Sequence, residues 1–282
     1  MASTTPTGLL IRPRHLAFDL PDPLPRHWHG GDAFKSHLFD AMSVLFPDGE
    51  RFFIDSVRLF RERIEDPVLK EQIRGFIGQE GHHSREHLVY SQRLRDQGYD
   101  VGRLEARAQR RIRFTQRTLS PQRQLAATVA LEHLTAIMAD ALLAKPQYLA
   151  GADPALVRLW RWHALEETEH KAVAFDVYQQ VCGDRALLRR AMRMATWFFL
   201  LDTFRGLAHM LARDGLAWNW RVWRDGLRFL WGRDGFFRSL LGAYRDFFRP
   251  GFHPWQHDNR PLMQRTRDEF EAPADAERAA LA

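Results

Sequence analysis

Three helix starts built in the same way constrain the fold of this 282-residue chain more than any other feature of its sequence. The starts are Asp66-Pro67, Ser120-Pro121 and Asp153-Pro154. In each, a side-chain oxygen can cap the helix, and proline stands at the first helical position, where its missing N–H costs nothing. The helices that follow are expected over residues 67–97, 121–145 and 154–182. Because the chain lacks the alternating apolar pattern of strands, the sequence predicts an all-α fold.

An earlier helix is expected over about residues 33–64, where Pro47 predicts a kink or a restart. By composition the whole chain divides into four parts. These are an irregular N-terminal arm (1–31), a metal-binding four-helix bundle (32–183), helices rich in aromatic residues and arginine that pack on the bundle (184–258), and a polar, loosely ordered tail (259–282).

Composition narrows the class of protein. The one cysteine, Cys182, excludes an intramolecular disulfide framework and cysteine-rich zinc modules. The net charge of +6 comes without a helix-turn-helix, zinc-finger or RNA-binding motif, so no nucleic-acid partner is expected. The first 20 residues lack the apolar core of a signal peptide, so a cytoplasmic location is expected.

Two Glu-x-x-His pairs, Glu80/His83 and Glu167/His170, lie on two of the expected helices. Residues three apart share one face of a helix, so the carboxylate and the imidazole of each pair can reach the same metal ion. One such pair is weak evidence, because Glu and His are common on solvated helix faces. Two pairs on two separate helices indicate a metal site much more strongly.

The other two helices each supply a glutamate in a largely apolar setting, Glu50 and Glu132. An ionised carboxylate is costly to bury there unless it is paired or bound to a metal. One Glu from each of two helices and Glu-x-x-His from each of two others is the ligand set of carboxylate-bridged dinuclear centres. The sequence therefore predicts a ferritin-like bundle that holds two metal ions.

The depth of these residues in their helices supports a single site. Glu80 and Glu167 each lie 13 residues after the proline that starts their helix, and Glu132 lies 11 residues after its own. At about 1.5 Å per residue, all three lie roughly 16–20 Å into helices of similar length. In an antiparallel bundle they therefore meet in one layer.

Two further histidines extend the ligand-bearing faces. His163 lies four residues before Glu167, among tryptophans, and is expected to be buried and to act as a seventh ligand. His87 lies four residues after His83 and is expected to belong to a polar network. Asp140 and Asp176 are candidates to accept a hydrogen bond from a ligating imidazole.

The neighbouring Glu166 is expected in interactions around the ligands or at the surface, and Glu169 is expected to be solvated or in salt bridges. A structural alternative needs no metal. In it, the buried carboxylates pair with cations supplied by Arg74, Arg85 or Lys171.

Several segments resemble the bacterial family described as predicted metal-dependent hydrolases, over roughly residues 10–258. The segments are FPDGE (46–50), QEGHH (79–83), LEH (131–133), WHALEETEHKAVAFD (162–176) and PGFHPW (250–255). The ligand series is also similar to that of ferritin-like di-iron oxygenases. With His163 included, it resembles the arylamine N-oxygenase group, which has an extra histidine.

Glutamate and histidine ligands without cysteine suit iron or manganese and do not exclude zinc. We expect two ions, with iron as the first choice. The function expected from this architecture is activation of dioxygen to oxidise a small or lipid-like organic substrate, with an electron donor as partner. The alternative is a metal-dependent hydrolase that uses a metal-bridged water.

The region over 185–248 is expected to form two or three helices in which aromatic residues alternate with arginines. Its most apolar stretch, 194–201, is too short to span a bilayer. Two interpretations remain open. The region packs on the bundle and perhaps offers a homodimer surface, or it contacts a membrane surface or a lipidic substrate.

Overall fold

The computed structural model describes residues 5–6 and 8–280, with side chains as far as Glu271. Within these residues the fold is all-α and contains no strand, as predicted. The helices are α1 (Ala33–Arg58), α2 (Pro67–Asp96), α3 (Val101–Thr118), α4 (Pro121–Ala144), α5 (Pro154–His170), α6 (Val173–Val181), α7 (Arg185–Arg213), α8 (Trp220–Trp231), α9 (Phe236–Asp246) and α10 (Arg260–Ala280).

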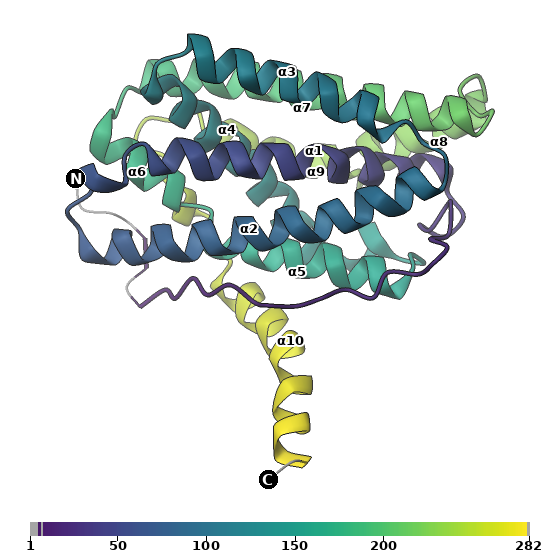
Figure 1. The fold of residues 1–282 in the computed structure, drawn as a ribbon, viewed down its shortest axis with the longest axis horizontal. Coiled ribbons are helices and arrows are strands. Elements are labelled where there is room, and N and C mark those ends of the chain that lie inside the picture. Colours follow the sequence, from purple (N-terminus) through teal and green to yellow (C-terminus); the bar gives the residue numbers. More distant parts are fainter. Residues whose placement is uncertain (1–4, 7, 281–282) are drawn as a thin grey trace.

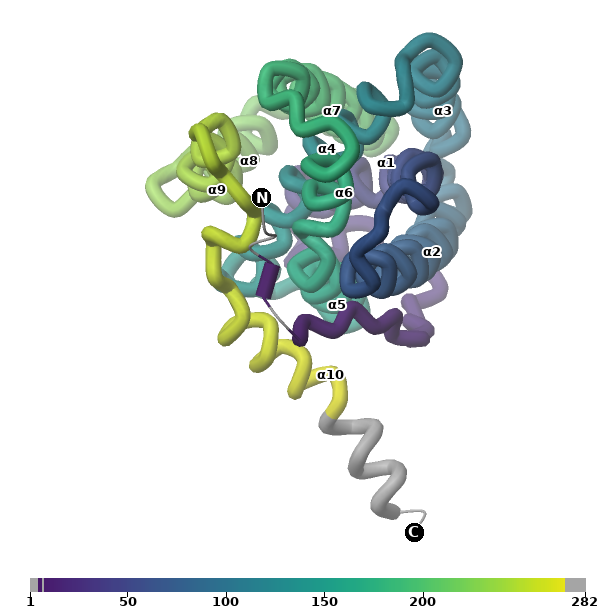
Figure 2. The backbone as a smooth tube through the Cα atoms, turned by 90° about the vertical axis from the view of Figure 1, so that its left-hand side faces the viewer, coloured from purple at the N-terminus to yellow at the C-terminus, as the bar shows by residue number. Residues whose placement is uncertain are grey.

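The helices that carry the candidate ligands pack side by side. α1 packs on α2, α4 packs on α5, and the two pairs meet through α1 and α4 (Figure 1). The end-on view places α4 among its neighbours, with α7 on one side and α5 on the other (Figure 2). α3 and α7 cover the same side of α1, opposite α2.

Helix α4 is the core helix of the fold. It is buried on nearly every side and packs against six other helices: α1, α5, α6, α7, α9 and α10. Among the described residues it alone is long and apolar enough to cross a membrane, but 72% of that window is buried inside the protein. Its apolar composition is therefore accounted for by its central position.

All three helix starts form as the sequence predicts. The side chains of Asp66, Ser120 and Asp153 accept hydrogen bonds from backbone N–H groups of the first turn of α2, α4 and α5. These caps fix where each helix begins, and so fix how deep its ligand residues lie.

Two helix boundaries differ from prediction. α1 runs unbroken through Pro47 and ends at Arg58 rather than at residue 64, because the chain turns back to bury Phe60 and Ile64. The helix expected over 154–182 is divided into α5 and α6 at Lys171, immediately after the last ligand residue. There the Lys171 ammonium group is held by the carbonyl of His257 and the side chain of Asn259.

Two further helices were not expected. α3 inserts a helix within residues 32–183, between the second and third helices of the bundle. The region expected to be a loosely ordered tail contains α10, which projects from the body in Figures 1 and 2. The first turns of α10 are anchored because Met263 and Thr266 are buried and Arg267 binds Glu169. The region over 185–248 forms three helices, α7 to α9, within the expected number.

Candidate metal centre

The structure brings all seven predicted ligand residues into one buried cluster. Each of these residues is at most 4% exposed. They are Glu50 from α1, Glu80 and His83 from α2, Glu132 from α4, and His163, Glu167 and His170 from α5.

Their ligand atoms form three overlapping groups, in each of which the atoms lie within 4.8 Å of one another. The groups are Glu50/His83/His163, Glu80/Glu132/His170 and Glu80/His83/Glu167. The first two share no residue, so they define two separate positions. The third joins them through Glu80 and His83, so the three groups form one continuous cluster of possible metal ligands.

The imidazole of His170 points into the middle of the cluster. Its Nε2 lies 3.0 Å from Glu80 Oε1 and 3.5 Å from Glu132 Oε2. It also lies 3.5 Å from Glu167 Oε1, and His163 Nε2 lies 3.2 Å from that same oxygen. Glu167 thus lies between the two histidines of its own helix.

Most polar atoms of the cluster have no hydrogen-bond partner among the described residues. These buried atoms are Glu50 Oε1, both oxygens of Glu80 and of Glu132, both nitrogens of His83, Glu167 Oε2 and His170 Nε2. Leaving one such group unsatisfied in a protein interior costs about 1–3 kcal/mol. All of them except His83 Nε2, which faces Glu166, are directed into one space. They fit metal ions, because oxygen and imidazole donors without protein partners are what a cation requires.

The charges of the cluster also indicate a site for cations. Burial, followed by the charge of a neighbouring carboxylate, raises the pKa of Glu50, Glu80 and Glu132 well above the usual range. Burial also acts on Glu167, but the nearby His170 outweighs it and lowers the pKa of that carboxyl group. Four carboxylates carry four negative charges when ionised, and two divalent cations would balance them.

The cations of the metal-free alternative lie elsewhere. Arg74 pairs with Glu71 and Arg85 with Glu86. Lys171 binds the His257 carbonyl and Asn259. Among the described residues, none of these three cations forms an ion pair with a cluster carboxylate, so the alternative does not account for the buried charge.

His83 is oriented from outside the cluster by Glu166. Its Nδ1 lies 3.6 Å from Glu167 Oε1, and its Nε2 lies 3.2 Å from Glu166 Oε2. Arg14 in turn donates to Glu166 Oε1 from its backbone N–H, at 3.0 Å, and from its guanidinium group, at 3.3 Å. A carboxylate on the far nitrogen of an imidazole fixes the orientation of the ring and strengthens it as a ligand.

His170 is oriented in a similar way by Gln79. The Oε1 atom of Gln79 lies 3.0 Å from His170 Nδ1, and the Nε2 of the same amide donates to Glu169 Oε2 at 2.7 Å. Glu169 is buried and is also bound by Arg14 and Arg267. The salt bridges that the sequence predicted for Glu169 form. Asp176, which was predicted to accept a hydrogen bond from a ligating imidazole, pairs with His253 instead.

Two glycines on α2 allow the N-terminal arm to come this close. A Cβ atom on Gly75 would lie 2.2 Å from the Ile11 carbonyl oxygen, and one on Gly78 would lie 2.4 Å from Pro13 Cγ. The arm therefore runs directly along the helix that carries Glu80 (Figure 1). This close packing is what delivers Arg14 to its two carboxylates.

His163 is held by the polar network expected of His87. His87 Nε2 lies 2.7 Å from His163 Nδ1, and His87 Nδ1 lies 2.8 Å from Ser43 Oγ. If His163 binds a cation through Nε2, its Nδ1 must carry the proton and donate it to His87. Both histidines are buried, as is Ser43.

A second group of possible ligands lies elsewhere, and it differs in one decisive respect. His27 Nε2 and His37 Nε2 both bind Asp214 Oδ2, at 2.7 and 2.8 Å. Arg26 and Tyr99 also bind Asp214, so its oxygens are satisfied by protein groups. This cluster is a hydrogen-bonded ion-pair network, and it lacks the unpartnered atoms of the seven-residue site.

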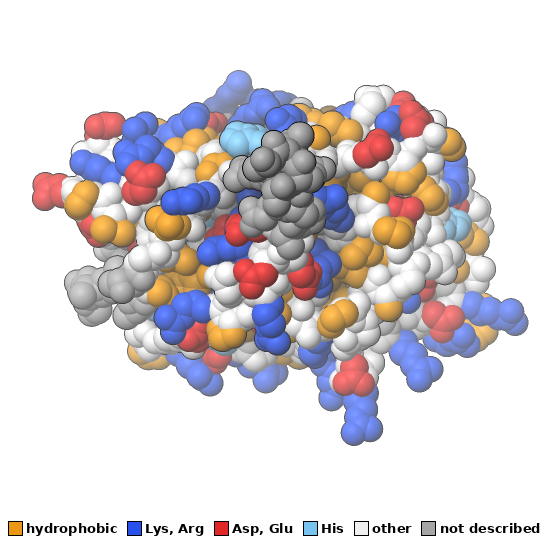
Figure 3. Space-filling view, turned by 90° about the horizontal axis from the view of Figure 1, so that it is seen from below, with side chains coloured by type: hydrophobic (Ala, Val, Ile, Leu, Met, Phe, Trp, Pro, Cys, Tyr) orange, Lys and Arg blue, Asp and Glu red, His pale blue; other side chains and the backbone are white. Residues whose placement is uncertain are grey.

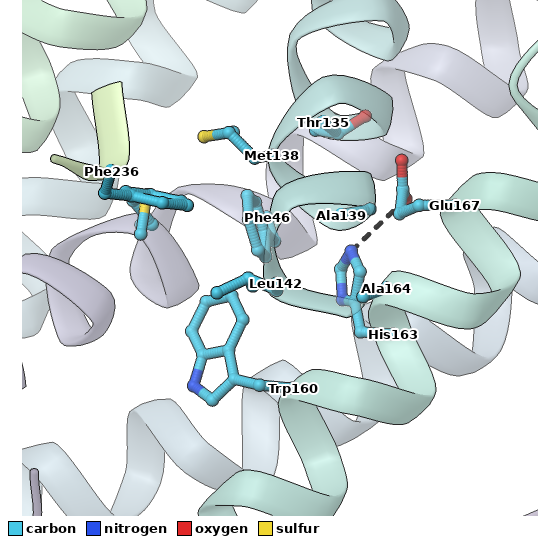
Figure 4. Close-up of a pocket in the computed structure, with 11 residues that line it drawn as sticks. Phe46, Thr135, Met138, Ala139, Leu142, Trp160, His163, Ala164, Glu167 and Phe236 are labelled. Atoms are coloured by element: carbon cyan, nitrogen blue, oxygen red, sulfur yellow. Dashed lines mark ion pairs between the residues drawn. The ribbon is translucent and has the colours of Figure 1, made fainter. Parts of the chain in front are cut away.

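Two cavities adjoin the ligands. A large one of about 530 Å³ has Glu50, His163 and Glu167 in its lining, together with many apolar side chains. A small one of about 20 Å³ lies beside the same His163 and Glu167 (Figure 4). Its other walls include Phe46 and Trp160, so its surface is almost wholly apolar.

A family model describing predicted metal-dependent hydrolases matches residues 12–258, which cover all seven residues of the cluster. The chain belongs to this family. The match confirms the resemblance seen in the sequence, and it extends from the arm that carries Arg14 to the segment after α9. No curated protein and no solved structure matched the chain. The predicted metal-dependent hydrolase family and the buried Glu/His cluster together support a metal-dependent enzyme, and the family description favours hydrolysis over oxidation.

Sequence reasoning missed Arg14 and Gln79. Gln79 directly precedes the ligand Glu80, so a polar side chain at this position on a buried face was a usable signal. Arg14 lies in a segment without periodicity, where no pattern distinguishes it from the other arginines of the chain.

Proposed function

We propose that this protein is an enzyme with two metal ions in a ferritin-like bundle, held by the seven residues of the cluster, and that it acts on an organic substrate in the large cavity. The observation that carries the proposal is the convergence of eight buried, unpartnered ligand atoms on one space. Glu50, Glu80, Glu132 and Glu167 would supply the carboxylate ligands, and His83, His163 and His170 would supply the imidazoles. The cavity gives a substrate direct access to Glu50, His163 and Glu167.

Hydrolysis is the reaction that the family description supports. Two bound divalent ions would supply a water with a lowered pKa and would polarise the bond to be cleaved. The chain's own contribution would be to hold the ligands rigid through Glu166 and Gln79, and to exclude bulk water with the apolar walls of the cavity.

Activation of dioxygen is the second candidate, and one observation favours it. The small cavity beside His163 and Glu167 is apolar, and such cavities stay dry and accept small apolar molecules. A hydrolytic centre gains nothing from a dry space next to its ligands. With redox-active ions and an external electron donor, this space suits a diatomic gas.

Metal analysis of protein purified without chelators tests the proposal. We expect about two ions per chain, and we expect Glu132→Ala to lose metal while a surface control, Glu62→Ala, keeps it. Oxygen-independent cleavage of an ester or amide with zinc or manganese bound would support hydrolysis. Oxygen consumption by the reduced, iron-loaded protein would support oxidation. Fully folded protein that binds no metal would overturn both.

A further inference from the structure

From the distribution of charge in the large cavity we infer that its ligand is an amphiphile, with an apolar chain directed toward the metal ligands and an anionic head group at the mouth. The inference rests on the proposed function, because it takes the inner end of the cavity to be the metal site. It adds the chemical class of the substrate. The chemistry recognised is that of a fatty-acid carboxylate or an anionic lipid.

The cavity runs from the metal cluster to the surface. Its inner end is formed by buried Glu50, His163 and Glu167. Its outer end includes Phe114 and Met194, which are 64% and 54% exposed. A cavity of about 530 Å³ falls within the range of about 300–1,000 Å³ that encloses a medium-sized organic ligand.

The walls between these ends are apolar. They are formed by side chains from α1, α3, α4 and α7, among them Phe52, Phe53, Leu131, Leu134 and Phe199. Such a surface stabilises a hydrocarbon chain by about 0.8 kcal/mol for each buried methylene group. It offers few partners to a polar body such as a sugar or a peptide.

The charged residues of the lining are separated by sign. The acidic residues in the lining, Glu50 and Glu167, belong to the metal cluster. The basic residues are arginines on α3, α4 and α7: Arg111, Arg123 and Arg190. An anionic head group would be attracted by these guanidinium groups, while the apolar walls would hold its hydrocarbon chain.

Two of the arginines are available for a ligand. Arg111 is paired with Asp202 and lies over the Phe198 ring. Arg123 and Arg190 are exposed, and neither has an acidic partner among the described residues. Guanidinium groups bind carboxylates and phosphates through paired, charge-assisted hydrogen bonds.

The rest of the surface gives a contrast. The face from which α10 projects carries basic and acidic side chains interspersed (Figure 3). Helices α3 and α7 lie on the side of the molecule away from α10 (Figure 1). They carry two of the lining arginines, Arg111 and Arg190, and the exposed lining side chains Phe114 and Met194. An anionic amphiphile needs both, because its head group binds cations and its chain binds apolar side chains.

Calorimetric titration of the purified, metal-analysed protein with decanoate, decanol and decyltrimethylammonium tests the inference. We expect decanoate to bind about tenfold more tightly than decanol, and the cation to bind more weakly than either. In the double variant Arg123→Gln/Arg190→Gln, decanoate should fall to the affinity of decanol while decanol binding is unchanged. Arg113→Gln on α3, which does not line the cavity, is the matched control and should behave as the wild type.

A second variant keeps the result interpretable. Ala191→Trp fills the cavity, and it should abolish binding of both decanoate and decanol while leaving metal content and the circular dichroism spectrum unchanged. Equal binding of decanoate and decanol to the wild type, or an equal loss in Arg113→Gln, would overturn the inference. Two bound ions without a preference for decanoate would support the proposed function and overturn the inference. A preference for decanoate in protein that binds no metal would support the inference and overturn the proposed function.

A separate experiment tests the source of the amphiphile. Co-sedimentation with phosphatidylglycerol vesicles, but not with phosphatidylcholine vesicles, and its loss in the double variant would indicate that the ligand is taken from an anionic membrane. Decanoate binding without co-sedimentation would indicate a free amphiphile.

Discussion

Arg14 donates two hydrogen bonds to Glu169, at 2.8 and 2.7 Å, across a separation of 155 residues in the chain. The same guanidinium group reaches Glu166, the residue that faces the outer nitrogen of His83. One side chain of the N-terminal arm therefore supports the groups that orient the candidate histidine ligands of both Glu-x-x-His pairs.

Arg14→Gln is expected to weaken metal binding without removing a ligand. Loss of outer partners of metal ligands commonly lowers affinity by about 10–100-fold. It also leaves Glu166 and Glu169 buried with one cation fewer, which should lower the melting temperature. Competition with a chromogenic chelator measures the affinity. Arg12→Gln, an exposed arginine on the same arm, should have no effect, and equal loss in both variants would refute the role of Arg14.

Gly75→Ala should displace the arm from α2, because the added Cβ would lie 2.2 Å from the Ile11 carbonyl oxygen. We expect a loss of about 1–3 kcal/mol in the free energy of unfolding, from overpacking against backbone. Gly81→Ala on the same helix is the control, because nothing lies within 4 Å of its added Cβ. That substitution should stabilise the helix by up to about 1 kcal/mol. Chemical denaturation of the two variants measures the difference.

Glu80 and His163 should differ in how much metal each retains when replaced. Glu80 belongs to two of the three ligand groups and His163 to one. Glu80→Ala is therefore expected to leave almost no bound metal, whereas His163→Ala should keep at least one ion per chain. Elemental analysis after gel filtration measures both. The reverse order would contradict the position of Glu80 in two of the ligand groups.

The network around Asp214 predicts a pH dependence of stability. Burial would raise the pKa of Asp214, but hydrogen bonds from His37 and its neighbours lower it to about 2. Burial would lower the pKa of His37, but Asp40 and Asp214 outweigh this and raise it. The Asp214 contribution is present above about pH 4 and is lost as the pH falls toward about 2. The His37 contribution is present below about pH 6.5 and is lost as the pH rises through its higher folded-state pKa.

Asp214→Asn should therefore lower the melting temperature most between about pH 4 and pH 6.5, and less on either side. Melting curves of the variant and the wild type, recorded across that range and beyond it, give the difference directly. A difference that does not change with pH would show that the network acts only through packing. The seven-residue cluster of the candidate metal centre is the same in both proteins. The contribution of its titration to the melting temperature therefore cancels in the comparison.

The ligand residues could be found from sequence because helical spacing decides which side chains share a face. Glu80 and His83 must point the same way on any helix, and the proline that begins each helix fixes the depth. The helix over Val101–Thr118 was missed, although Val101, Leu104 and Ala108 follow a helical repeat after the capping residue Asp100. This capped helical repeat was a usable signal for the helix.

Other features could not be predicted from local pattern. The turn at Lys171 depends on contacts with His257 and Asn259, which lie more than 80 residues further on. The part of α10 that packs on the body is anchored by Arg267 on Glu169. Such contacts arise from tertiary packing, which a window of neighbouring residues does not contain.

The position of the arm has a consequence for how the protein is made. Arg14 is synthesised 152 residues before its partner Glu166, so the surface on which the arm docks is completed only after α5 has been synthesised. Closing so long a loop is slow compared with forming the helices themselves. The arm is thus made before the surface on which it docks. A nascent chain would have its ligand helices assembled, and open to ions from solution, before Arg14 binds Glu166 and Glu169.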